Sequence, residues 1–385
     1  MLEVGGPPVQ RPIEFDRAGS WLYHSSFPSA RESARCAFDG MREGVTSVEG
    51  PRFRPARVIP ALMTVGLVLV FVACSGDPYP QSTLHPTSDG GTAIDRLFSQ
   101  IFWWAVVVFV VVESALLYTV IRFRARPERG DPKHVHGNTL MEISWTLAPA
   151  AILVFIAVPT ILTIFETDGS APANAIQVEV IGHQWWWEFR YPQLDLVTAN
   201  ELHIPQGHPV QLIMSSADVI HSFWVPKLHG KRDVMPGRTT RLAFTADSVG
   251  TFLGQCAEFC GASHANMRMR VMVQAPSEFD AWVQAQRQST PVDTADRRVV
   301  AGRQLFGRTC IACHAIDGIG GAIGPDLSHV GSRTTIAAGI LPNDSAGLTR
   351  WIGNPGAEKP GNLMPQFPLE PDDLAALVAY LRSRR

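Results

Sequence analysis

Side chains that bind soft metals are concentrated in one short stretch of the sequence, GQCAEFCGASHANM. It contains Cys256, Cys260, His264 and Met267, and Glu258 lies between the two cysteines. A disulfide, a zinc site, a copper site or a surface loop could each be built from these residue types. The choice among them decides what the chain can do.

Copper is the metal that this stretch favours. Thiolate, thioether and imidazole ligands select copper over magnesium or calcium. Zinc would be satisfied by two cysteines and two histidines, including His221 in the preceding ADVIHSFWVP, and would leave Met267 unused. A disulfide between Cys256 and Cys260 is possible outside the cytoplasm, but the nearby histidines and methionine argue against it. Two bridging thiolates with one histidine per metal suit a pair of coppers.

A second cofactor motif is CIACH, the attachment signature of a c-type haem. Cys310 and Cys313 would bind the two vinyl groups, and His314 would be the proximal iron ligand. A redox CxxC or half of a zinc site is the alternative, but no second CxxC follows. Met364 is the only methionine after the motif, and a thioether as sixth ligand raises the potential of the iron. His329 is the competing ligand.

Two apolar blocks predict the elements that hold these modules at a membrane. Residues 97–123 and 143–166 are both long enough to span a bilayer, which takes about 20 apolar residues; buried helices of a soluble protein are the alternative. The connection at 124–142 is rich in arginine, whereas residues 75–95 contain no lysine or arginine. The positive-inside rule therefore predicts that the connection is cytoplasmic and that both flanks lie outside.

The N-terminal part resembles a targeting segment. Residues 52–74 have a basic lead and a short apolar stretch that ends at Cys74, a pattern typical of a bacterial lipoprotein signal with Cys74 as the lipidation site. An uncleaved anchor helix is the alternative. Residues 1–51 are either a disordered leader or a mis-assigned start, with the true start at Met41.

The region after the second block divides into two modules. Short alternating runs at 174–275, broken by Gly, Pro, Asn and Asp, predict an antiparallel β-sandwich or barrel. A helix and a linker are expected at 276–298. Residues 299–385 are predicted to be helical, and PDDLAALVAYLRSRR has a single apolar face. We therefore expect a multidomain membrane protein with a two-helix hairpin, a β-sandwich and an all-α domain.

Several function classes are disfavoured by composition. The net charge of −2 gives no basic field for nucleic acid. Neither predicted span contains a histidine, so the chain cannot supply histidine ligands to haems inside the bilayer. Any oxygen reduction would therefore take place in a partner subunit.

Several motifs of the chain resemble those of a known family. GHQWWWEF, DVIHSFWVPKLHGKRDVMPGR, GQCAEFCGASHANM and MEISWTLAPA are similar to subunit two of the haem–copper cytochrome c oxidases. The likeness covers residues 97–273, and the C-terminal module resembles the subclass with a fused cytochrome c. The resemblance implies a cupredoxin-like fold for 174–275 and a class I cytochrome c fold for 299–385.

The resemblance also implies a binuclear copper centre, CuA, in the sandwich. Its ligands would be Cys256, Cys260, His221, His264, Met267 and the backbone carbonyl of Glu258. The two cysteines would bridge the coppers, each histidine would bind one copper, and the last two ligands would be weaker. The Glu258 carboxylate would reach a magnesium ion at the boundary with subunit one.

Other positions carry roles by the same resemblance. Trp185 matches an aromatic residue that passes electrons towards copper, and packing within the sandwich is its alternative role. Glu142 matches a glutamate at the mouth of a proton path, or is a plain helix-entry carboxylate. His183 is expected to be structural. The remaining histidines His203, His208 and His229 are expected at the surface or in loops, and GTFLGQC departs from the family's tyrosine-rich approach to the copper loop.

The implied function is electron entry into a respiratory oxidase of the bacterial plasma membrane, with both termini and the cofactor domains on the outer face. Electrons would pass from a donor, either cytochrome c or a quinol-oxidising complex, to covalently bound haem c and then to CuA. Subunit one, accompanied by subunit three, would reduce O2 to water with proton translocation. A stand-alone electron carrier, a nitrogen-oxide reductase and a disulfide-stabilised binding module remain as alternatives.

Overall fold

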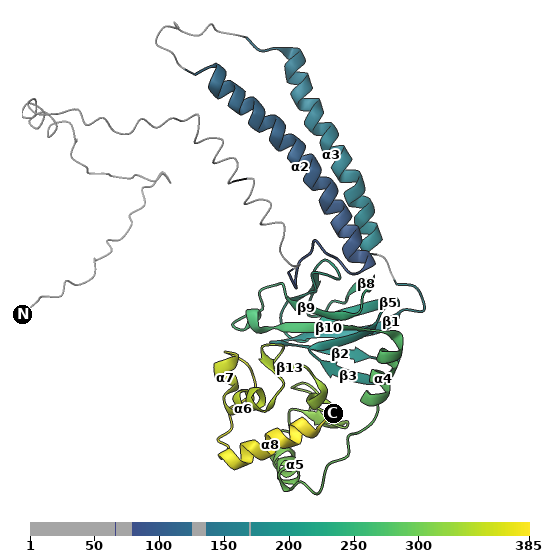
Figure 1. Ribbon diagram of the computed structural model, residues 1–385, viewed down its shortest axis with the longest axis vertical. Coiled ribbons are helices and arrows are strands. Elements are labelled where there is room, and N and C mark those ends of the chain that lie inside the picture. Colours follow the sequence, from purple (N-terminus) through teal and green to yellow (C-terminus); the bar gives the residue numbers. More distant parts are fainter. Residues whose placement is uncertain (1–65, 67–78, 125–135, 169–170) are drawn as a thin grey trace, which may run out of the picture. The chain divides into compact units, whose positions relative to one another are not determined.

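The computed structural model describes residue 66 and residues 79–124, 136–168 and 171–385 (Figure 1). The expectations for 1–51 and for the signal segment 52–74, including Cys74, lie outside the described residues. So does most of the connection at 124–142. Each remaining part of the chain is described below.

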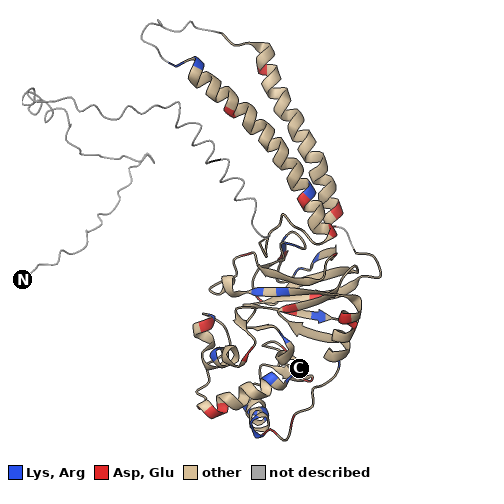
Figure 2. Ribbon diagram, viewed as in Figure 1, with Lys and Arg blue, Asp and Glu red and all other residues tan. Residues whose placement is uncertain are grey.

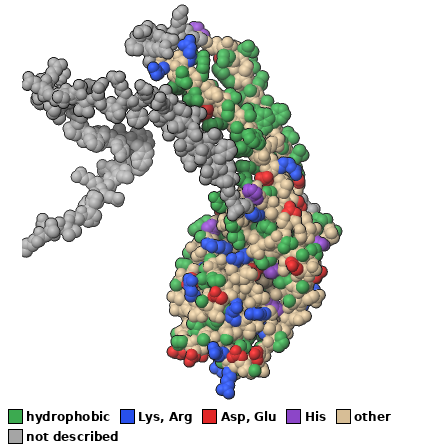
Figure 3. All heavy atoms as spheres, in the orientation of Figure 1, with side chains coloured by type: hydrophobic (Ala, Val, Ile, Leu, Met, Phe, Trp, Pro, Cys, Tyr) green, Lys and Arg blue, Asp and Glu red, His purple; other side chains and the backbone are tan. Residues whose placement is uncertain are grey.

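Two long helices, α2 (Asp89–Arg122) and α3 (Thr139–Thr167), are long and apolar enough to cross a membrane. Figure 2 shows that they are almost free of charge between their ends, and Figure 3 shows apolar side chains covering them. Helix α2 begins before the predicted Leu97 because the Ser88 side chain caps it by accepting from Gly91 N. Glu113 is half-buried in an apolar hollow between the two helices, as expected of a carboxylate kept from lipid.

Residues 176–274, which contain the expected copper ligands, fold as two five-stranded sheets. The first sheet, in the order β3-β2-β1-β5-β8, consists of β1 (Ile176–His183), β2 (Trp186–Tyr191), β3 (Leu196–Ala199), β5 (Pro209–Ser216) and β8 (Thr240–Thr245). The second, in the order β4-β10-β9-β6-β7, consists of β4 (Glu201–Pro205), β6 (His221–Trp224), β7 (Arg232–Val234), β9 (Gly250–Cys256) and β10 (Arg268–Gln274).

The two sheets share one apolar core because buried and outward residues alternate along their strands. Val178, Val180, Leu212 and Val271 are fully buried in it. Most strand pairs are antiparallel as predicted, but β1 pairs with β5 and β4 with β10 in parallel. Parallel neighbours need crossover connections, and here the chain passes to the other sheet between them. Helix α4 (Pro276–Gln286) packs on this sandwich through Phe279 and Val283.

The C-terminal region forms a second core around helices. Its elements are α5 (Arg297–Thr309), β11 (Ala315–Ile316), β12 (Ile319–Gly320), η2 (Val330–Ser332), β13 (Thr335–Ile336), β14 (Leu341–Pro342), α6 (Ser345–Gly353), α7 (Pro355–Glu358) and α8 (Pro371–Ser383). Helix α8 has Pro371 in its first turn and buries Leu377, Val378 and Leu381 on the predicted face. Gly302 lets α5 approach α8 closely, since a Cβ there would collide with the Ala376 carbonyl.

A buried carboxylate joins the sandwich to the C-terminal domain. Glu201 on β4 is 2% exposed, and one of its oxygens accepts from the backbone N of Thr334 at 2.8 Å and of Thr335 at 3.1 Å. The hydroxyls of both threonines donate to the same oxygen. Arg270 on β10 also donates to the Thr335 hydroxyl. Charge-assisted hydrogen bonds of this kind are among the stronger ones in proteins.

We therefore expect Glu201→Ala to lower the free energy of unfolding by roughly 2–4 kcal/mol, because it leaves buried donors unsatisfied. The measurement is denaturant unfolding of the full chain in detergent. Asp280→Ala, which removes an exposed carboxylate from α4, should change this free energy by less than about 0.5 kcal/mol. Equal effects of the two substitutions would show that the Glu201 contact is not a significant source of stability.

Candidate functional site

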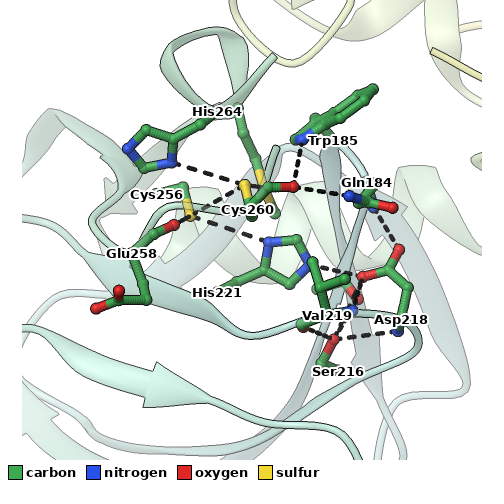
Figure 4. A network of polar contacts seen from close by, with 12 residues as sticks. Gln184, Trp185, Ser216, Asp218, Val219, His221, Cys256, Glu258, Cys260 and His264 are labelled. Carbon is green, nitrogen blue, oxygen red and sulfur yellow. Dashed lines mark hydrogen bonds and ion pairs between the residues drawn. The ribbon is translucent and has the colours of Figure 1, made fainter. Parts of the chain in front are cut away.

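The six groups expected to bind copper converge at one end of the sandwich (Figure 4). Strand β9 ends at Cys256, and the loop that follows carries Cys260 and the short helix η1 (His264–Asn266). Met267 lies just before β10, and its carbonyl accepts from Cys256 N at 2.9 Å. His221 opens the adjacent strand β6. Pairing of β9 with both β6 and β10 thus brings the two sequence motifs together.

The distances place the two sulfurs at the centre of the group. Cys256 Sγ and Cys260 Sγ are 3.8 Å apart, far beyond the about 2.05 Å of a disulfide bond. Cys256 Sγ lies 3.9 Å from His221 Nδ1, and Cys260 Sγ lies 3.6 Å from His264 Nδ1. Each cysteine therefore has its own histidine.

Two further groups complete the ring of donors. The Met267 Sδ lies 3.9 Å from Cys260 Sγ, and the Glu258 carbonyl oxygen lies 3.2 Å from Cys256 Sγ. Met267 is fully buried and the cysteines are 4% and 3% exposed. The donor set is two thiols, two imidazole Nδ1 atoms, a thioether and a carbonyl. This set fits a pair of coppers, because zinc has no use for the thioether.

The cysteine pair divides one negative charge. The hydrogen bond between Cys256 and Cys260 lowers the pKa of Cys256 to about 3. The hydrogen bond between Cys256 and His221 lowers this pKa further. The contact with Cys256, together with burial, raises the pKa of Cys260. Two thiolates this close repel each other without a cation, so the metal-free pair has one thiolate and one thiol. The thiolate is the form that binds metal.

Asp218 orients the first histidine. Its carboxylate lies 2.8 Å from His221 Nε2, on the opposite side of the ring from Cys256. Burial opposes protonation of His221, but the hydrogen bonds to Asp218 and Cys256 raise the pKa of the histidine above its usual value. A carboxylate on the far nitrogen fixes the tautomer and leaves Nδ1 free for a metal. The sequence analysis did not identify Asp218, although it precedes His221 by only three residues.

Trp185 lies in the turn between β1 and β2 and reaches the copper loop. Its indole N donates to the Cys260 carbonyl at 2.9 Å, and the Gln184 side chain donates to the same oxygen at 2.7 Å. Trp185 is 6% exposed and belongs to the sandwich core. The position of Trp185 is therefore compatible with both expected roles, packing within the sandwich and electron transfer towards copper.

Glu258 and Glu142 occupy different surroundings. The Glu258 carbonyl faces Cys256, whereas its carboxylate points away from the sulfurs, 3.5 Å from Lys231 Nζ (Figure 4). Glu142 is exposed in the first turn of α3. The structure therefore does not bring Glu142 to the copper loop, which accords with a separate role at the other end of the hairpin.

A mostly apolar cavity in the C-terminal domain is lined by Cys310, Cys313, His314 and Met364. His314 Nδ1 bonds the Pro325 carbonyl at 2.8 Å, which leaves Nε2 for a ligand. Burial lowers the pKa of His314, so the ring is neutral. These features fit a haem held by two thioether bonds and one imidazole.

Two neighbours of this cavity bear on the ligand assignments. A Cβ at Gly324 would lie 2.5 Å from His314 Cε1, so a glycine is needed beside the ring. His329 is buried and does not line the cavity in the described part of the chain. The geometry therefore favours Met364 over His329 as the sixth ligand.

The haem cavity reaches the sandwich. Gln184, Trp185 and Trp186 also line it, so one tryptophan borders the cavity and hydrogen-bonds the copper loop. Lys359, 3% exposed, donates from Nζ to the Trp185 carbonyl and, at 3.2 Å, to the Ala337 carbonyl. Burial lowers the pKa of Lys359 to about 7. Nothing in the surrounding sequence GAEKPGNLMP singles out this lysine.

The expectation of surface or loop positions is wrong for His203 and right for His229, which lies in the loop between β6 and β7. His203 lies on β4 and stacks on Trp282 with ring centroids 4.3 Å apart. His229 is 6% exposed, packed against the first turn of α2. His208 is exposed as expected. His183 stacks on Trp186 and bonds Glu188 at 2.9 Å, outside the copper loop.

Comparison with known families matches three consecutive parts of the chain. Residues 83–162 match "Cytochrome C oxidase subunit II, transmembrane domain", and residues 193–275 match "Cytochrome C oxidase subunit II, periplasmic domain". Residues 299–385 match "Cytochrome c". The second match implies copper of the CuA type, and the third implies haem.

Curated relatives carry corresponding names. "Cytochrome c oxidase subunit 2" of Alkalihalophilus pseudofirmus is 40% identical, covering 72% of this chain and 83% of the relative. The protein of the same name from Bacillus subtilis is 30% identical, covering 83% and 96%. "Quinol oxidase subunit 2" of Bacillus anthracis is also 30% identical, covering 66% and 89%.

Among solved structures, the periplasmic domain of subunit II of cytochrome oxidase of Bradyrhizobium japonicum is 30% identical. It covers 31% of this chain and 97% of that one, with a TM-score of 0.30. The identity and coverage of the curated relatives, with three family matches in succession, show that the chain belongs to the cytochrome c oxidase subunit II family and carries a C-terminal cytochrome c domain.

Proposed function

We propose that this chain is the electron-entry subunit of a respiratory oxidase that reduces O2 to water and translocates protons. Electrons from an external donor enter at the haem domain and leave through the copper domain towards subunit one. The observation that carries the proposal is the position of Trp185. Its side chain borders the haem cavity and donates to the carbonyl of Cys260 in the copper loop.

In the copper domain, Cys256 and Cys260 would hold the two coppers through their thiolates. His221 and His264 would each bind one copper through Nδ1. Met267 and the Glu258 carbonyl would be the weaker ligands. A binuclear copper centre, when bound, supplies one-electron exchange with little rearrangement. The residues of this chain hold it at the end of a rigid sandwich and bury it from water.

In the haem domain, Cys310 and Cys313 would hold the haem through thioether bonds, and His314 Nε2 and Met364 would bind its iron. A haem with these ligands supplies a one-electron carrier whose potential is raised by the thioether. The Pro325 carbonyl orients the His314 ring by accepting from Nδ1. Because the domain is part of the chain, it raises the effective concentration of the electron carrier at the copper domain.

The hairpin α2–α3 would anchor the subunit in a bacterial plasma membrane beside subunits one and three, with the cofactor domains on the periplasmic side. The Glu258 carboxylate, which faces away from the sulfurs, would exchange its contact with Lys231 for a magnesium ion at the boundary with subunit one. Glu142 at the start of α3 would lie at the mouth of a proton path. The donor would be cytochrome c or a quinol-oxidising complex, and Cys74 would be lipidated.

Replacing one bridging cysteine tests the copper assignment. We expect Cys260→Ser to abolish copper binding. The serine hydroxyl stays protonated at neutral pH and cannot replace a thiolate ligand. Metal analysis and spin resonance of the purified oxidase measure the loss. Cys310→Ser, the matched control in the haem domain, should disturb the haem and leave the copper content unchanged. A copper-free wild-type protein with Cys256 and Cys260 joined in a disulfide would refute the assignment.

Removing the carboxylate behind His221 tests how the site is oriented. We expect Asp218→Asn to weaken copper binding by roughly tenfold or more, since such partners hold the imidazole of a metal ligand in place. Competition with a copper chelator measures the affinity. Asp280→Asn, on exposed α4, should bind copper like the wild type. Unchanged affinity in Asp218→Asn would show that the backbone alone orients His221.

Deleting residues 299–385 tests the route of electrons. The copper content should stay intact, because the sandwich has its own core, but turnover should depend on added soluble cytochrome c. Oxygen uptake with and without that cytochrome measures the dependence. Unchanged turnover with the natural donor would mean that the haem domain is not the entry point.

A further inference from the structure

We infer that Lys359 is a positioning residue that holds the Trp185 side chain between the haem cavity and the copper loop. The inference rests on the proposed transfer of electrons from the haem domain to the copper domain. It adds a residue of the haem domain that acts on Trp185 through its backbone. Residues 359–362, the short segment that follows helix α7, make these contacts.

The first observation is how Lys359 is held. Its side chain is almost wholly buried, and its amine donates to one carbonyl in each domain, that of Trp185 in the sandwich and that of Ala337 in the haem domain. Both of these acceptors are backbone carbonyls and carry no charge. A buried amine is costly unless its donors are satisfied. The lysine therefore depends on this contact between the domains.

The second observation is that the same segment covers the indole. A Cβ at Gly361 would lie 2.9 Å from Trp185 Cη2, and one at Gly261 of the copper loop would lie 3.0 Å from Trp185 Cζ2. The indole is therefore in close contact with two glycines, one from each domain. Ser263 of the copper loop donates to the Pro360 carbonyl at 2.7 Å, which fixes the segment over the ring.

The third observation connects this segment to the haem cavity. The Asn362 side chain donates to the Lys359 carbonyl at 2.6 Å, and its oxygen accepts from Met364 N at 2.9 Å. Met364 lines the cavity. One stretch of backbone thus sets the positions of the candidate iron ligand and of the tryptophan that touches the copper loop.

These contacts separate the role of Lys359 from general docking of the domains. The Glu201 contact with Thr334 and Thr335 joins the domains through a different pair of segments. Removing only the lysine amine should therefore leave the domains associated. What it removes is the bond to the Trp185 carbonyl, so the indole would sample positions farther from one of the two sites.

The test uses the purified oxidase with both metal groups bound, comparing wild type, Lys359→Met and Lys227→Met. Methionine keeps the side-chain length and removes the donors, and Lys227 is a half-buried lysine whose carbonyl accepts from Thr87 N just before α2. After rapid reduction of the haem, the optical change of the copper centre gives the rate of transfer. We expect Lys359→Met to slow it roughly tenfold, the order expected for loss of a charge-assisted hydrogen bond.

Three accompanying results are required. The haem spectrum, the copper content and the two reduction potentials should match the wild type, and Lys227→Met should transfer at the wild-type rate. A wild-type rate in Lys359→Met would overturn the inference and leave the proposed function standing. A potential shift large enough to explain the slower rate would also overturn it, because Lys359 would then act by charge. Absence of haem-to-copper transfer in the wild type would instead refute the proposed function.

A second pair of variants covers the case in which Lys359→Met fails to accumulate. Gly361→Ala places a methyl group against the indole at a residue with φ of +80°, whereas Gly356→Ala meets only ordinary contact with Asn354 at 3.8 Å. Gly361→Ala should slow transfer with the copper content unchanged, and Gly356→Ala should not. Equal rates in these two variants would overturn the inference.

Discussion

The two sulfurs of Cys256 and Cys260 lie 3.8 Å apart in a buried site, and the rest of the copper domain is arranged around this contact. Without a cation the pair cannot hold two negative charges, and outside the cytoplasm it is exposed to oxidation. Rigid flanks keep the sulfurs near each other but unbonded. Strand β9 delivers Cys256, and β6 delivers His221. The bond from Cys256 N to the Met267 carbonyl closes the loop and holds Met267 beside the two cysteines.

The haem domain is tied to this site by polar contacts more than by a shared apolar core. The two hydrophobic cores are separate. Glu201 binds two threonines of the haem domain, Ser263 binds the Pro360 carbonyl, and Lys359 binds the Trp185 carbonyl. Hydrogen bonds are directional, so they fix the orientation of one domain on the other in a way that apolar contact alone does not. This fixed orientation sets how closely the haem cavity approaches the copper loop.

The hairpin is joined to the copper domain by a similar set of bonds. Asp89 in the first turn of α2 accepts from Thr245 N at 2.8 Å, and Asp168 after α3 pairs with Arg232 at 2.7 Å. Ser88 donates to the Leu228 carbonyl as well as capping α2. The start of α2 and the end of α3 are therefore both bound to the sandwich. These bonds hold the sandwich against the end of the hairpin.

The sequence alone determined the modules and indicated the candidate metal-binding groups. Apolar length predicted α2 and α3, alternation predicted strands, and the spacing of Cys256 with Cys260 and of Cys310 with Cys313 indicated two cofactors, because such signals are local. The tertiary structure alone decided which distant residues support them. The parallel pairing of β1 with β5, the burial of His229, and the contacts of Asp218 and Lys359 all depend on segments that meet only after folding. A lysine near the C-terminus and a tryptophan 174 positions earlier share no local pattern, so the contact between them is a property of the fold.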